Sequence, residues 1–282
     1  MKTSRHTFLV SGLLAALALP ALADDGDHDG DDDLESPASE SPDGLFAVRR
    51  GVQSPAGMLS ARVTLAMNLS ADLVGKPVSL APDIYYGVND RLQIGLVHQG
   101  PMHWQSRPGL GLCLTGEDNG CASVYDNVGF DALYGLLYGD QLNLSAHAAL
   151  YLTSFDPATA YVAVGAAGKV HFGDDLALAF DPQLVFALSD RDLNDDGLFL
   201  PVELQVQVNV PTSVKLLTGI SGSFSAFGDT YQVPLGIGVV RNLTEHIDLG
   251  ARFSFDNLLG KTPDGVSRAD TRSLALLLNL RS

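Results

Sequence analysis

The stretch from Gln141 to Thr153 alternates between apolar and polar residues, and this alternation constrains the fold more than any other feature of the sequence. Successive side chains of a β-strand point to opposite faces, so the stretch predicts a two-faced strand. Its polar face carries amides, hydroxyls and an imidazole but no Lys, Arg, Asp or Glu. Such a face is typical of an enclosed, hydrated lumen, which leaves the apolar face to contact lipid.

The same alternation recurs along the chain and predicts about twelve strands, each close to the length that a tilted strand needs to cross a bilayer. No helical period of comparable strength follows the first 23 residues. An even number of strands returns both ends of a barrel to the same side. The predicted strands are 59–70, 77–88, 91–99, 127–138, 141–153, 161–170, 176–189, 201–210, 214–224, 231–240, 246–256 and 271–281.

The predicted connections alternate between short and long. The short ones include Asn89-Asp90 and Gly139-Asp140, which suit tight hairpins, and the longest runs from Gly100 to Asp126. This alternation is typical of short periplasmic turns and longer external loops. A soluble β-sandwich or ligand-binding barrel is the structural alternative, but it would place a charged set of side chains outside. We therefore predict an all-β, transmembrane, antiparallel up-and-down β-barrel over residues 59–282.

The N-terminal part of the chain differs from the rest. Residues 1–23 have the basic, apolar and small-residue order of a secretory signal peptide that ends at Ala23. Residues 24–44 contain ten acidic residues and no Lys or Arg, which accounts for most of the formal net charge of −16, and predict a disordered segment. Residues 45–58 form a transition to the barrel. The acidity and the lack of a basic surface argue against a nucleic-acid partner.

With its signal peptide and the alternation from Leu59 to Ser282, the chain resembles the outer-membrane β-barrel proteins of Gram-negative bacteria, in particular porin-like barrels of about twelve strands. The resemblance rests on pattern and identifies no subfamily. It implies a location in the outer membrane, contact with its lipid, and insertion by the barrel-assembly machinery. One departure is the ending Leu280-Arg281-Ser282, where such barrels often carry an aromatic residue.

Two local features are candidate sites outside the lumen. Asp192, Asn194, Asp196 and Glu203 match the ligand spacing of a calcium-binding EF-hand loop, but no flanking helices are predicted, so a weak calcium site competes with a solvated acidic loop. No other cofactor is expected. Cys113 and Cys121 lie in the longest predicted loop of an exported chain, which favours a local disulfide over two free thiols. That loop could narrow the barrel mouth or cap it from outside.

The inward positions define the expected chemistry of the lumen. Ser145 and His147 share the polar face, but no third partner of a catalytic triad stands out, and we predict no enzyme. Positive and negative groups are about balanced, which favours weak ion selectivity. The residues predicted to line the lumen are Arg62, Arg91, Asp131, Asn143, Ser145, His147, Lys169, Asp181, Gln205, Gln207, Lys215, Asp248 and Arg252.

The expected function is a passive pore for small hydrophilic solutes. The alternative is a structural or adhesive barrel with a closed lumen, whose external loops bind a partner. An outer-membrane hydrolase is the third hypothesis and has the least support in the sequence.

Overall fold

A computed structural model describes residues 46–70, 73–98, 102, 108–262 and 271–282. The predicted signal peptide at 1–23 and the acidic segment at 24–44 lie outside the described residues. The described chain is almost entirely extended, and its only assigned helical element is the short 3₁₀ turn Glu117–Asn119. Within the same residues, no helix is long and apolar enough to cross a membrane.

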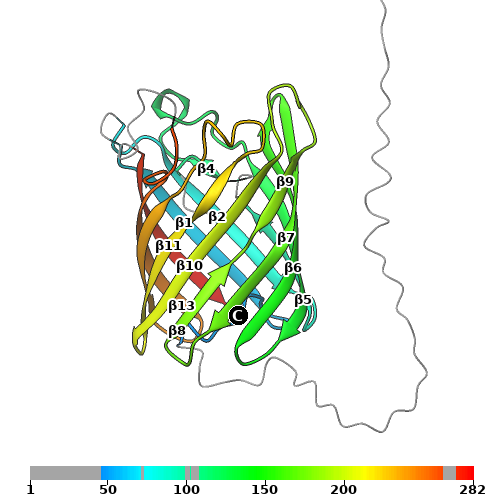
Figure 1. Ribbon diagram of the computed structural model, residues 1–282. Coiled ribbons are helices and arrows are strands. Elements are labelled where there is room, and N and C mark those ends of the chain that lie inside the picture. Colours follow the sequence, from blue (N-terminus) through cyan, green and yellow to red (C-terminus); the bar gives the residue numbers. More distant parts are fainter. Residues whose placement is uncertain (1–45, 71–72, 99–101, 103–107, 263–270) are drawn as a thin grey trace, which may run out of the picture. The chain divides into compact units, whose positions relative to one another are not determined.

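The described residues form one antiparallel sheet (Figure 1). Its strands are β1 (Leu59–Asn68), β2 (Val78–Gly87), β3 (Leu92–Val97), β4 (Leu112–Cys113), β5 (Val128–Tyr138), β6 (Leu142–Phe155), β7 (Ala158–His171), β8 (Leu176–Phe180), β9 (Gln183–Ala187), β10 (Gly197–Asn209), β11 (Thr212–Ser223), β12 (Leu235–Asn242), β13 (Ile247–Phe255) and β14 (Arg272–Arg281).

The sheet closes on itself because β1 pairs with both β2 and β14. Val63 lies opposite Pro82 on one side and Leu278 on the other. β8 and β9 are successive halves of one wall position, since both pair with β7 and β10, and β4 pairs only with the outer part of β2. The described wall therefore has twelve strands with two extra strand segments, and the predicted up-and-down barrel of about twelve strands is confirmed.

Several predicted strand boundaries were wrong. The predicted strand 176–189 is broken into β8 and β9, and the strand predicted from Pro201 begins four residues earlier, at Gly197. β6 and β7 extend toward each other until only residues 156–157 connect them. Hydrophobic alternation therefore does not by itself mark where strand pairing starts or stops.

The two faces of the wall differ as the alternation predicts. Large apolar side chains project outward and are exposed on many strands, among them Phe130, Ile237 and Leu276. Polar side chains fill the interior, where Thr64, Ser145 and Ser213 are buried. A wall that is apolar outside and polar inside is the arrangement of a barrel surrounded by lipid.

The two ends of the barrel also differ (Figure 1). One end, here called the short-turn end, carries the connections 88–91, 139–141, 172–175, 210–211 and 243–246. The opposite end, the long-loop end, carries the connection 98–127 and the projecting hairpin of β6 and β7. The last residue, Ser282, lies at the short-turn end, where its backbone N–H donates to the carbonyl of Leu59.

Candidate functional site

A set of charged side chains surrounds the middle of the barrel interior and is called the central belt here. Opposite Arg62 on the neighbouring strand lies Asp83. Arg62 is also within electrostatic range of Asp131 and Glu203 across the lumen. The belt consists of Arg62 (β1), Asp83 (β2), Asp131 (β5), His147 (β6), Asp181 (between β8 and β9), Glu203 (β10), Lys215 (β11) and Arg252 (β13).

His147 bridges two carboxylates of the belt. Its Nε2 lies 3.0 Å from Asp131 Oδ2, and its Nδ1 lies 2.8 Å from Asp181 Oδ1. Gln183 donates from Nε2 to Asp181 Oδ2 over 2.8 Å. A histidine ring whose two nitrogens both face carboxylates donates from both, and is therefore an imidazolium. The bridge joins β5, β6 and the β8–β9 link, and the His147 side chain is only 6% exposed.

Asp181 contacts His147 at a break in the wall between β8 and β9. Pro182 occupies the gap between β8 and β9, where its missing N–H leaves no ladder hydrogen bond to lose. Pro201 lies on the facing part of β10, at the same gap. On β7, a Cβ at Gly165 would overlap the carbonyl oxygen of Pro182, so this close approach requires glycine.

The charges of the belt are separated into two arcs. The order of strands around the barrel is β1-β14-β13-β12-β11-β10-β8-β7-β6-β5-β3-β2, and β2 returns to β1. In this order, the Arg and Lys residues of the belt lie on the strands from β1 to β11, and its Asp and Glu residues lie on the strands from β10 to β2, where His147 on β6 lies between Asp131 and Asp181. The basic arc is Arg62, Arg252 and Lys215; the acidic arc is Glu203, Asp181, Asp131 and Asp83.

The arcs meet at two seams. At one, Lys215 Nζ lies 2.8 Å from Glu203 Oε1. At the other, Arg62 and Asp83 are partners on adjacent strands. The side chains of Lys215, Glu203 and Asp181 remain 27%, 20% and 28% exposed although they point inward. The belt therefore borders space that water can enter.

Several polar atoms of the interior have no hydrogen-bond partner among the described residues. They include Oδ1 of Asp131 on the acidic arc and Nε of Arg252 on the basic arc. Oε1 of Gln205 and Oγ of Ser145 are further cases, and both residues are buried. Because an unpartnered buried polar atom is costly, such atoms are typical positions for ordered water.

An apolar cluster lies between the belt and the long-loop end. Tyr151, Tyr161, Phe199 and Leu217 are buried in it, and Met102 packs against them from the loop that follows β3. These side chains project from β6, β7, β10 and β11. This part of the interior is therefore occupied by apolar and aromatic side chains.

Residues 46–58, here called the N-terminal plug, lie inside the short-turn end of the barrel. Lys169 Nζ of β7 donates to the carbonyl of Ala47 at 3.1 Å and to that of Arg50 at 2.8 Å. The Arg50 guanidinium pairs with Asp248 of β13 at 2.7 Å. Val48 is fully buried, and its N–H lies 3.5 Å from Oε1 of Gln207 on β10.

The other half of the plug contacts the opposite wall. Gln53 donates to the carbonyl of Leu133 on β5 at 2.7 Å, and the N–H of Ser54 donates to Oε1 of Gln93 on β3 at 2.6 Å. On β2, a Cβ at Gly87 would overlap the carbonyl oxygen of Pro55. With contacts from β2 round to β13, the plug crosses the lumen. The sequence predicted only a transitional segment at 45–58, because no periodicity marks these residues.

Most residues predicted to line the lumen are buried or half-buried on the inner side of the wall. Arg91 is the exception, because β3 begins only at Leu92 and Arg91 lies exposed in the preceding turn. Ser145 and His147 share the inner face but form no hydrogen bond with each other, since both His147 nitrogens face aspartates and Ser145 Oγ has no partner among the described residues. The residues on the inner side are Arg62, Asp131, Asn143, Ser145, His147, Lys169, Asp181, Gln205, Gln207, Lys215, Asp248 and Arg252.

The four residues of the calcium pattern are not brought together. β10 begins at Gly197, so Glu203 lies six residues along an extended strand, roughly 20 Å from the loop at ~3.3 Å per residue. There it pairs with Lys215, while Asp192 is exposed in the loop and Asn194 accepts a hydrogen bond from Tyr161. No group of three or more His, Cys, Asp or Glu residues in the described part of the chain is placed to hold a metal ion.

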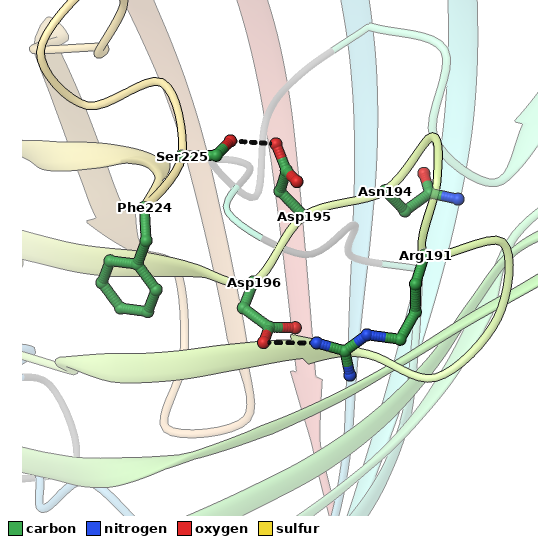
Figure 2. Close-up of a pocket in the computed structure, with 6 residues that line it drawn as sticks. All are labelled: Arg191, Asn194, Asp195, Asp196, Phe224 and Ser225. Atoms are coloured by element: carbon green, nitrogen blue, oxygen red, sulfur yellow. Dashed lines mark hydrogen bonds and ion pairs between the residues drawn. The ribbon is translucent and has the colours of Figure 1, made fainter.

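The same loop forms one side of a surface pocket at the long-loop end (Figure 2). Arg191 donates to Asp196 at 2.7 Å, and Ser225 donates to Asp195. Phe224 completes one wall. The acidic groups of this pocket are therefore engaged by neighbouring side chains rather than directed at a common point.

Cys113 and Cys121 form the predicted disulfide. The described part of the long connection completes the wall where β3 is short: β4 pairs with β2 at Ser79 and Leu80, and the N–H of Gly109 donates to Ser79 Oγ. Residues 99–101 and 103–107, which include His103, Trp104 and Arg107, lie outside the described residues. The loop was expected either to narrow the barrel mouth or to cap it from outside. Its described part instead extends the wall beside β2 and packs Met102 against the apolar cluster.

Solved structures share this fold. A structure described as the KdgM porin superimposes with a TM-score of 0.51 at 8% sequence identity, covering 78% of this chain and 98% of that one. The NanC porin superimposes with a TM-score of 0.53 at 8% identity, covering 79% and 98%. At this identity the likeness concerns the fold alone. No family model and no curated protein sequence matches the chain.

Proposed function

We propose that this protein is a channel of the Gram-negative outer membrane that lets small hydrophilic solutes diffuse through its lumen. The observation that carries the proposal is the central belt, a ring of charged side chains that retains water-accessible surface inside a wall with an apolar exterior. A barrel that served only as a scaffold would gain more from an apolar core than from charges in its middle. The likeness in fold to two porins supports the same proposal.

The N-terminal plug is proposed to restrict this channel at the periplasmic side. Short turns face the periplasm in such barrels, which places the plug at that mouth. The sequence suggested such a restriction for the loop at residues 100–126, which lies at the opposite mouth. It is held by few strong contacts, chiefly Lys169 to two carbonyls and Arg50 to Asp248.

Conductance across planar bilayers tests the proposal. The test compares the native protein with a plug-weakened variant that combines Lys169→Met and Arg50→Gln. Asp248 keeps its contact with Arg281 in this variant, so the wall retains its own ion pair. We expect small or intermittent conductance in the native protein and a several-fold larger conductance in the variant, because the plug loses its charged anchors.

Arg49→Gln is the matched control, because Arg49 belongs to the same segment but pairs with Asp174, whose side chain is 76% exposed. Such an exposed pair contributes little, so the control should conduct like the native protein. Folding of each variant is checked by its heat-dependent shift in gel mobility. A folded plug-weakened variant that shows no conductance would refute the channel.

The second candidate function is a structural or adhesive barrel with a closed lumen. Two observations favour it: the plug crosses the short-turn end, and the apolar cluster narrows the passage toward the other end. Lack of conductance in every folded variant would support this function instead.

A further inference from the structure

The two arcs of the central belt create a dipole across the lumen. Around the ring of strands, β13 with Arg252 and β5 with Asp131 are separated by roughly half the circumference in either direction. A solute in the lumen therefore has positive charge on one side and negative charge on the other. This differs from a ring of one sign, which favours ions of the opposite sign.

The seams and the centres of the arcs differ in how far their charged and polar groups are already paired within the protein. At the seams, Lys215 pairs with Glu203, and Arg62 lies next to Asp83, so opposite charges compensate one another. At the centres, Nε of Arg252 and Oδ1 of Asp131 have no hydrogen-bond partner among the described residues, although Oδ2 of Asp131 contacts His147. Both atoms are enclosed by protein, so the two arcs act on a solute through the charges of these side chains.

We propose that the belt selects small zwitterions, whose carboxylate faces Arg252 while their ammonium group faces Asp131. The proposal rests on the channel function and names its solute class.

The charge pattern discriminates between classes of solute. A simple anion gains from the basic arc but is repelled by the acidic arc, and a simple cation meets the reverse. A neutral solute loses hydration without a charge interaction to offset it. Only a solute with both charges complements both arcs. Charge interactions in a partly buried lumen are also stronger than in bulk water.

Glycine and glycolamide provide a matched pair of probes. They are isomers of the same formula, but glycine is a zwitterion at neutral pH and glycolamide is uncharged. Entry of each into proteoliposomes is measured by swelling in the plug-weakened background. We expect glycine to enter faster than glycolamide by about three- to tenfold, the effect of one or two charge interactions in a partly wet interior.

Arg252→Gln and Asp131→Asn test the arcs separately. Each variant should bring the ratio of glycine to glycolamide entry close to one. Their reversal potentials in a salt gradient should shift in opposite directions, toward cation selectivity for Arg252→Gln and toward anion selectivity for Asp131→Asn. Asp229→Asn and Lys76→Gln, which change exposed residues of the long loops, are the controls and should keep the native ratio.

The outcomes separate this proposal from the channel function. If both probes enter at equal rates, or if the two arc variants keep the native ratio, the selectivity is overturned while the channel stands. If neither probe enters through the folded protein, the channel itself fails. Because Asp131 also binds His147, Arg252→Gln alone decides the matter should Asp131→Asn not fold.

Discussion

His147 is the residue that stabilises the acidic side of the interior, because it lies between Asp131 and Asp181. His147→Leu leaves two carboxylates close together without a cation. Removing one partner of a buried charge network typically costs about 3–5 kcal/mol, so we expect the free energy of unfolding in detergent micelles to fall by roughly that amount. Urea titration followed by gel mobility measures it.

The control for this prediction removes all three charges at once. His147→Leu combined with Asp131→Asn and Asp181→Asn leaves no unpaired charge, and should recover most of the lost stability. An equal loss in the triple variant would show that packing of the ring, not charge, is what matters.

Gly165 permits the close approach of β7 to the break in the wall. Gly165→Val places a branched side chain against the Pro182 carbonyl, a backbone atom that cannot move alone. We expect a loss of about 1–3 kcal/mol in unfolding free energy, as for other overpacked interiors. Gly139→Ala is the control, since its Cβ would come no closer than 3.5 Å to another atom. A similar loss in both variants would contradict the proposed steric cause.

The disulfide stabilises the loop that carries β4 as a unit separate from the long wall strands. Cys113→Ser with Cys121→Ser opens the loop that completes the wall beside β2. The local cost is about 2–3 kcal/mol for a loop of this length, but it falls on the patch and not on the paired strands. We expect faster proteolysis within the loop and an unchanged unfolding midpoint of the barrel. The native protein treated with a reductant should behave in the same way; resistance to proteolysis in both would count against this role.

The elements show what the sequence could predict. Alternation located the wall strands, because lipid outside and a polar lumen inside impose a period of two on each of them. It did not reveal the break at Pro182, since the inward set from Ala177 to Ala187 keeps the same period across the gap. The residue types and spacing match those of a calcium loop, but the geometry does not, because Glu203 belongs to an extended strand.

The plug was beyond prediction for a different reason. Its residues show no periodicity, and its anchors are remote in sequence: Lys169 lies 119 positions after Arg50, and Asp248 lies 198 positions after it. No local pattern indicates such contacts. The division of the belt into two arcs was equally hidden, because it depends on the order of strands around the barrel and not on the number of charges.

At the scale of the whole molecule, the apolar exterior predicts how the barrel tolerates charge. Val239 on β12 faces outward beside Arg252, near the middle of the wall, whereas Val208 faces outward near the short-turn end. Val239→Arg should cost about 2–4 kcal/mol of folding free energy in vesicles, and Val208→Arg should cost about 0–1 kcal/mol. Denaturant titration in lipid vesicles measures both. Equal costs would contradict a membrane centred on the belt.

The shared contacts of Asp248 imply an order of assembly. This carboxylate binds Arg281 near the end of the final strand as well as Arg50 of the plug. Pairing of β1 with β14 joins the ends of the wall, so it carries the largest chain-closure cost and is expected late. The plug cannot reach β3, β7 and β13 together until the sheet has curled. Docking of the plug would then follow closure of the barrel. It would stabilise the closed state against separation of β1 from β14.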